Sequence, residues 1–274
     1  MGYDLTGSYD LHIHTGPDVI PRKLDDLEMA RQAADAGMRG FAVKSHVFPT
    51  PGRAAILRAL YPELDVVGGI ALNREVGGIH ADAVEAAAKM GARMLWFPTM
   101  DAKAYRKERN DPNWAAGLTA LDEGGNVSEE ALQVLEVAKR YDLVVGTGHL
   151  GGEEAIRLVE AGHKLGLKRM CLTHVTLPVC QMSVEQLNRC VAWGAMAEYS
   201  YCHLLSGKCS IEYVVEQIRA IGAEHVYLST DLGQKNNPYP VEGLLTFCTL
   251  LQEHGITDSE LDRMLKINPH TLLY

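Results

Sequence analysis

The chain has 274 residues, of which 47% are hydrophobic and 22% charged, and its formal net charge at pH 7 is −9. This composition is typical of a globular protein with a large core, and the acidic balance argues against nucleic acid and anionic membranes as partners. The sequence shows no secretory signal peptide and no apolar run of membrane-spanning length. A small molecule is therefore the expected partner, and a homo-oligomer is left open.

Strand-like and helix-like segments alternate along the chain. Apolar runs predict eight strands, at 9–14, 40–46, 66–72, 93–98, 143–149, 169–174, 195–199 and 226–231. Amphipathic stretches predict eight helices, at 24–36, 52–60, 79–90, 128–141, 152–165, 183–193, 211–221 and 241–254. Such alternation predicts βαβ units, and eight units are the count of a closed barrel. We therefore predict an α/β fold, a single-domain (β/α)8 TIM barrel over residues 1–274.

One connection is much longer than the others, and it runs from Met100 to Val127, between the fourth strand and its helix. A βα loop normally takes a few residues, and in a barrel it lies over the active site. We expect this loop to act as a lid that brings cations or Trp114 to a substrate. A solvated decoration or a subunit contact is the alternative.

The six cysteines lie in the second half of the chain, and none belongs to a CxxC pair. This usage is typical of reduced core residues in a cytoplasmic protein.

Two histidines, His12 and His14, end the first predicted strand. Alternation along a strand points both to the same side, as a shared metal ion requires. His149, His174 and Asp231 end the fifth, sixth and eighth predicted strands. The carboxyl ends of barrel strands converge around one mouth, so these five residues are expected to meet there.

These residues resemble the pattern of the amidohydrolase superfamily, which has HxH on strand 1, His on strands 5 and 6, and Asp on strand 8. The tail Asn268-Pro269-His270-Thr271-Leu272-Leu273 is also similar to the one that often closes such barrels. The resemblance implies that His12, His14 and Asp231 hold a buried metal. It implies that His149 and His174 bind a second metal, or divide into one ligand and one electrostatic helper.

The chain departs from many two-metal members, which place a carboxylated lysine at the end of strand 4, because no lysine occurs there until Lys103. The second predicted strand instead offers Lys44 and His46 on one face. Lys44 could be the carboxylated bridge, a cation for a substrate carboxylate, or a Schiff-base amine. Glu75 is another candidate bridge. The number of metal ions is therefore left open.

The expected chemistry is hydrolysis of an amide, lactone or similar C–N or C–O bond, since a bound divalent ion acidifies water and polarises an oxygen. Asp231 is the expected general base, and His174 or His149 would orient the nucleophile or stabilise an oxyanion. Zinc is the favoured ion, with Mn, Fe, Co or Ni as alternatives. The candidate substrate-binding residues are Arg22, His46, Asn73, Glu75, Thr99 and His203.

Three other functions remain open. Related barrels use one metal to decarboxylate or hydrate small carboxylic acids, and Lys44 and Arg22 suit an anionic substrate. A phosphoesterase of the polymerase-and-histidinol-phosphatase (PHP) type also begins with HxH, but the clear eighth unit counts against it. A barrel that keeps its metal without catalysis is the last alternative, and Asp231 argues against it.

Overall fold

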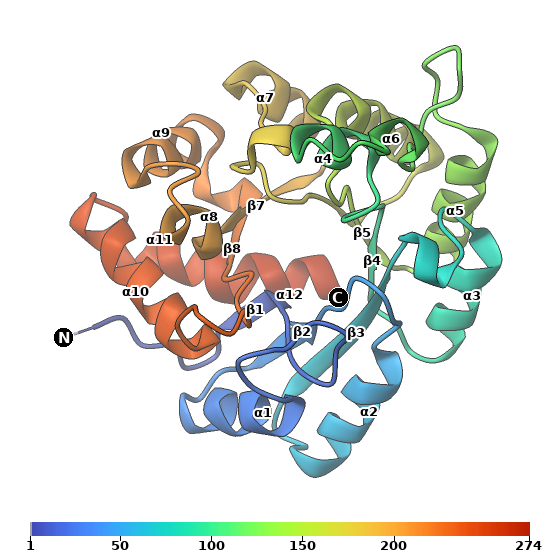
Figure 1. Cartoon of the computed structure of the whole chain (residues 1–274). Helices are drawn as coiled ribbons and strands as arrows, with labels where there is room; N and C mark the ends of the chain where they lie inside the picture. The colour runs from blue at the N-terminus through green and yellow to red at the C-terminus, as the bar shows by residue number, and fades with distance from the viewer. Residues whose placement is uncertain (1) are drawn as a thin grey trace.

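The computed structural model describes residues 2–274, and its centre is a sheet of eight parallel strands paired in chain order (Figure 1). The prediction of a (β/α)8 barrel is confirmed, and each predicted strand is present. Most strands end slightly earlier than predicted, so His14, Lys44, His149, His174 and Asp231 lie just past them, while His12 lies within the first strand. The strands are β1 Tyr9–Ile13, β2 Gly40–Val43, β3 Asp65–Ala71, β4 Met94–Trp96, β5 Val144–Gly146, β6 Met170–Leu172, β7 Met196–Ser200 and β8 Val226–Ser229.

The eight predicted helices surround the strands. They are α1 Asp26–Asp35, α2 Pro51–Leu60, α3 Ala81–Lys89, α5 Glu129–Arg140, α6 Gly152–Leu165, α7 Val184–Ala192, α9 Ile211–Ile221 and α10 Pro240–Glu253. Their starts follow from the sequence: the side chain of Ser128, for example, accepts the N–H of Ala131 at the first turn of α5. Within residues 2–274, no helix is both long and apolar enough to cross a bilayer.

The structure also contains shorter helices in the loops and in the C-terminal tail. The α-helices among them are α4 Lys103–Glu108, α8 Tyr201–Leu205, α11 Asp258–Asp262 and α12 Asn268–Leu273. The others are η1 Arg74–Val76, η2 Trp114–Ala116, η3 Pro178–Cys180, η4 Ala223–His225 and the π-helical η5 Arg263–Ile267.

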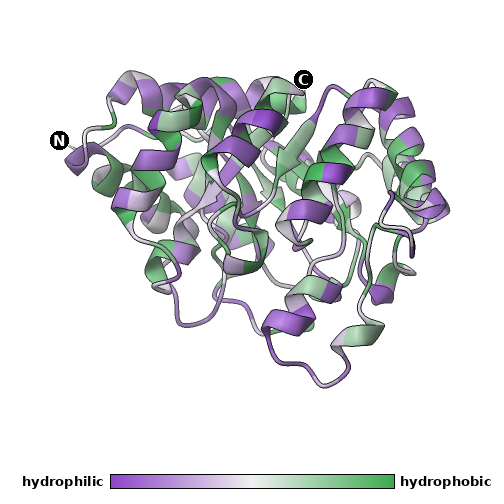
Figure 2. Ribbon diagram, turned by 90° about the horizontal axis from the view of Figure 1, so that it is seen from above, coloured by the Kyte–Doolittle hydropathy of each residue, from purple (hydrophilic) through white to green (hydrophobic). Residues whose placement is uncertain are grey.

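Apolar side chains form two layers, one inside the barrel and one between the strands and the helices. Figure 2 shows the hydrophobic residues concentrated in the strands and the hydrophilic ones along the outer helices. Trp96 of β4 and Tyr227 of β8 belong to the inner layer and are fully buried. The barrel is thus packed solid below its mouth.

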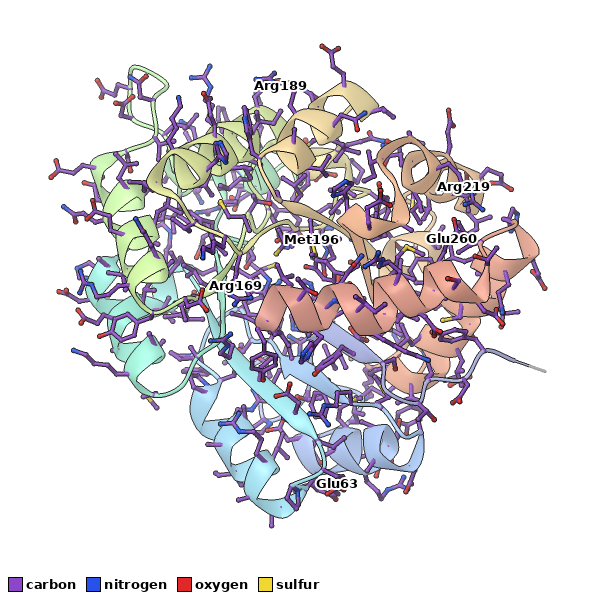
Figure 3. The ribbon with its side chains drawn as sticks, turned by 180° about the vertical axis from the view of Figure 1, so that it is seen from behind. Glu63, Arg169, Arg189, Met196, Arg219 and Glu260 are labelled. Carbon is purple, nitrogen blue, oxygen red and sulfur yellow. The ribbon has the colours of Figure 1, made fainter. Side chains whose placement is uncertain are left out.

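The C-terminal helical run crosses the end of the barrel opposite the mouth, as Figure 3 shows from behind. Asn268 donates from its side-chain amide to the backbone oxygens of Ala223 and Val226. Arg169 donates to the backbone oxygen of Thr271. These bonds fix the tail against β8 and the start of β6, so this end serves stability.

The first and last strands meet mainly at the mouth. The N–H of Asp231 donates to the oxygen of His12 at 2.9 Å, and that of His14 donates to Leu232 at 2.8 Å. The buried carboxylate of Asp10 accepts both the N–H and the hydroxyl of Thr230. Candidate site residues therefore form part of the contact between β1 and β8.

Candidate metal centre

Three histidines converge on the carboxylate of Asp231. Its Oδ1 lies 3.1 Å from His14 Nε2 and 3.4 Å from His12 Nε2, and its Oδ2 lies 3.8 Å from His174 Nε2. Ligand atoms about 2.1 Å from one zinc ion in a tetrahedral arrangement lie roughly 3.4 Å apart. The spacing of these side chains therefore suits a divalent cation.

The charge state of the histidines also suits a metal. Burial lowers the pKa of His14 to about 4 and holds the pKa values of His149 and His174 well below their usual range. The imidazoles are therefore neutral at pH 7, the form that binds metal. Burial alone would raise the pKa of Asp231, but the histidines around it outweigh burial and hold that pKa well below its usual range.

Protein oxygens orient most of the imidazoles. Each of four rings has a hydrogen-bond partner at Nδ1, which fixes the ring orientation and leaves Nε2 as the other nitrogen able to bind a metal. The pairs are His12 with Glu198, His46 with Thr99, His174 with Ser200 and His203 with Thr176. The buried Nδ1 of His149 has no hydrogen-bond partner among residues 2–274. A bound ion or water would satisfy this atom.

Lys44 lies at the bottom of the centre. Its fully buried ammonium nitrogen is 2.8 Å from His12 Nε2 and 5.2 Å from the ring centroid of Trp96. Burial lowers the pKa of Lys44 to about 8, although Asp231 and Glu198 act in the opposite direction. Trp96 ends β4, where many two-metal amidohydrolases have a carboxylated lysine. The lysine of this chain, Lys44, instead follows β2.

Glu198 of β7 is a functional candidate that the sequence analysis missed. It is fully buried, and its Oε1 accepts hydrogen bonds from His12 Nδ1 and from the hydroxyl of Ser229, each at 2.7 Å. Its Oε2 lies 3.3 Å from the backbone nitrogen of His174. The available signal was an acidic residue in the middle of an otherwise buried strand.

A cavity of about 260 Å³ opens above these residues. Most of the predicted site residues line it, from loops that follow six different strands. They are His14, Arg22, His46, His149, His174, His203 and Asp231. His12 and Lys44 lie beneath, fully buried.

Three predicted substrate-binding residues have other partners, and a fourth lies outside the cavity lining. Asn73 donates to Thr99 Oγ1 and to the backbone oxygen of His46, and its side-chain oxygen accepts the N–H of Thr99. These hydrogen bonds connect the loops that follow β2, β3 and β4. Arg22 pairs with the buried carboxylate of Asp18 at 2.7 Å. Glu75 lies exposed on η1, away from the cavity lining.

The long loop contributes to the cavity, but not through the residue that the sequence analysis named. Met100 and Tyr105 line the cavity, and the ring centroid of Tyr105 lies 4.6 Å from that of His149. Trp114 instead stacks beneath the ammonium groups of Lys103 and Lys107. Figure 1 shows α4, which carries Tyr105, beside the strands at the centre of the ring.

The backbone is strained at two of the candidate ligands. His174 has φ of 58° and Asp231 has φ of 51°, in the left-handed region that non-glycine residues rarely adopt. Residues held in this way cluster at functional sites, because the surrounding structure must impose the conformation.

Residues 7–198 match a family of unknown function, DUF6282. A dihydroorotase from Carboxydothermus hydrogenoformans is 22% identical over 313 residues, which cover 98% of this chain and 72% of that protein.

Solved structures share the fold at low sequence identity. An amidohydrolase from Pseudomonas aeruginosa is 11% identical, with a TM-score of 0.67 over 98% of this chain and 95% of that one. A mutant of organophosphorus hydrolase from Deinococcus radiodurans is 13% identical, with a TM-score of 0.59 over 100% and 95%. These neighbours confirm the resemblance to amidohydrolase-type barrels, on which the expectation of an enzyme rests.

Proposed function

Because the chain belongs to the DUF6282 family and has the fold of metal-dependent hydrolases, we propose that it hydrolyses an amide, lactone or similar bond of a small molecule. The observation that carries this proposal is the convergence of three histidines on the Asp231 carboxylate, at the mouth of the barrel. Catalytic residues of TIM barrels lie at this end of the strands.

His12, His14 and Asp231 would hold one divalent ion, with zinc favoured. His149 and His174 would hold a second ion, or one of them would face the substrate. A divalent ion at this place supplies Lewis acidity and a water of lowered pKa. Asp231, held as a carboxylate, accepts the proton of the attacking water and returns it to the leaving group. Asn73 and Thr99 then serve to orient His46.

Replacement of Asp231 by Asn tests this assignment. Asparagine keeps the size and tolerates the left-handed backbone, but it cannot take up the proton. We expect kcat to fall at least about 100-fold, while the far-ultraviolet circular dichroism spectrum stays unchanged. Turnover within a few-fold of the unchanged protein would remove Asp231 as the base. The assay is a panel of amides and lactones, with the metal content measured by elemental analysis.

Lys44 is the candidate bridging ligand. Its buried amine can add to carbon dioxide, which forms an N–C bond, releases one proton and leaves an anionic carbamate. The carbamate would supply oxygen ligands from the residue that follows β2. Metal-depleted protein should then regain activity faster with zinc plus bicarbonate than with zinc alone. Equal recovery in both conditions would contradict the carbamate.

An unmodified Lys44 favours the second candidate function, metal-dependent decarboxylation or hydration of a small carboxylic acid. Lys44, whose nitrogen is 2.8 Å from His12 Nε2, would then supply positive charge beneath the site rather than a ligand oxygen. Turnover of β-keto or unsaturated acids, with no turnover of amides and lactones, would favour this reading. One metal equivalent per chain would agree with it.

A further inference from the structure

The charges that line the cavity are unbalanced. Among its lining residues within 2–274, Asp231 is the one acid, and it belongs to the proposed metal centre. Two side chains with permanent positive charge line the same cavity, Arg22 and Lys208. Any divalent ion adds more positive charge, although the chain as a whole carries −9. The cavity is therefore suited to an anion and unsuited to a cation.

The two cations are not equivalent. The guanidinium of Arg22 forms two hydrogen bonds with Asp18 Oδ2, and that carboxylate is buried, so its charge is already compensated. The side chain of Lys208 has no ion-pair or hydrogen-bond partner in the described part of the chain. Lys208 is thus the cation available to a ligand.

A backbone turn holds the main chain of Lys208 at the rim of the cavity. The short helix α8 ends in a Schellman motif: Gly207 adopts φ of 67°, and the N–H of Lys208 donates to the oxygen of His203. His203 itself lines the cavity and is buried. Burial lowers the pKa of His203 to about 4, with Lys208 acting in the same direction and Asp231 in the opposite one. Lys208 therefore acts electrostatically on the site from its rim.

Part of the remaining wall is apolar. Ile20, Met100 and Leu177 line the cavity from the loops after β1, β4 and β6. Ile20 is 46% exposed and Met100 is 42% exposed, values that leave apolar surface for a ligand to cover.

From this arrangement we infer that Lys208 binds a carboxylate on the substrate, so that the substrates are small acids with an apolar body and a hydrolysable C–N or C–O bond. The inference rests on the proposed function, which supplies the bond to be cleaved. Lys208 is then a specificity-determining residue. Its ammonium gives a charge-assisted hydrogen bond that a neutral analogue cannot accept as strongly.

Matched pairs of ligands test the inference by binding alone. The probes are acetylglycine, N-acetylleucine and hippurate, each compared with its own carboxamide, which has nearly the same shape without the charge. Calorimetric titration of the metal-loaded protein should show at least one acid bound about tenfold more tightly than its amide. Lys208→Met should abolish this preference, whereas Lys235→Met, at an exposed lysine outside the cavity, should keep it.

Three outcomes are distinguishable. A preference that survives Lys208→Met overturns the inference, because the metal alone then recognises the acid. An absence of preference in the unchanged protein for all three pairs overturns it as well. A preference that depends on Lys208, with no hydrolysis of any amide or lactone, supports the anion site and contradicts the proposed function.

Discussion

Glu198 lies on β7, a strand that supplies none of the proposed metal ligands. Its carboxylate accepts a hydrogen bond from His12. Burial alone would raise the pKa of this carboxyl, but His12, Ser229 and Lys44 outweigh burial and lower it. The resulting carboxylate holds the Nδ1–H of His12 and keeps Nε2 directed at Asp231. Outer carboxylates of this kind fix the ring orientation and raise the basicity of a metal-binding imidazole.

Replacement of Glu198 by Gln should therefore weaken metal binding by about 10–100-fold, because the amide holds the ring less firmly and carries no charge. Competition with a chromogenic chelator measures this affinity without any substrate. Glu63→Gln is the control, since this exposed residue lies at the far end of the barrel (Figure 3). Equal metal affinity in both variants would mean that Glu198 serves only packing.

At the scale of elements, the strand ends decide where each ligand points. Gly148 follows β5 with φ of 64°, directly before His149. A Cβ at this position would lie 2.2 Å from the oxygen of Phe97 and 2.5 Å from that of Pro98. The turn that presents His149 thus passes against the end of β4, where only glycine fits.

Gly148→Ala should lower the free energy of unfolding by roughly 3 kcal/mol or more, since overpacking adds to the left-handed strain. Gly166→Ala is the matched control. Gly166 ends α6 with φ of 79°, and the nearest atom to its Cβ would be 3.9 Å away. It should lose only about 1–2 kcal/mol. Urea unfolding of the two variants gives the comparison, and equal losses would contradict the close approach.

The sequence was sufficient for the regular elements, because each strand and each long helix follows from a local hydrophobic period. It was also sufficient for the residues at strand ends, since parallel strands bring them together whatever the loops do. It did not predict α4, which brings Tyr105 to the cavity, and it did not predict that Trp114 of η2 lies outside the cavity lining. Nor did it predict Glu198 and Lys208, whose importance depends on distances between elements far apart in the chain.

At the scale of the whole molecule, acid should destabilise the metal-free protein. Burial lowers the pKa of His14 to about 4 and that of His46, His149 and His174 well below the usual 6.5. Below about pH 6.5 the unfolded chain therefore binds protons that the folded protein does not, and stability falls toward pH 4. Burial raises the pKa of Asp10 to about 7, which acts in the opposite direction, but five histidines act toward instability in acid, because burial also lowers the pKa of His203 to about 4.

The melting temperature of chelator-treated protein should accordingly decrease between pH 7 and pH 5, by roughly 2–4 °C for each kcal/mol lost. Scanning calorimetry at several pH values measures this decrease. The metal-loaded protein should melt at a higher temperature but lose at least as much over the same range, because the ion keeps the folded imidazoles unprotonated while the unfolded chain still takes up protons. A constant or rising melting temperature without metal would contradict the burial of neutral histidines.

Metal removal should also have a local effect at the contact between β1 and β8. His12 and His14 belong to one side of this contact and Asp231 to the other, so a shared ion would hold the two sides together. After chelation, the amide hydrogens of His14 and Asp231 should exchange faster with solvent, while those between β2 and β3 keep their rates. Hydrogen exchange followed by mass spectrometry reports on both regions. Equal rates with and without metal would place the ion elsewhere.

The contact between β1 and β8 has a consequence for protein synthesis. During synthesis β1 is made first. His12 and His14 can contact Asp231 only after almost the entire chain has been synthesised. A chain that is interrupted before β8 lacks both the final strand and the carboxylate beside those histidines. With Asp231 in its proposed role, activity would require a chain that is complete through β8, and truncated chains would be inactive.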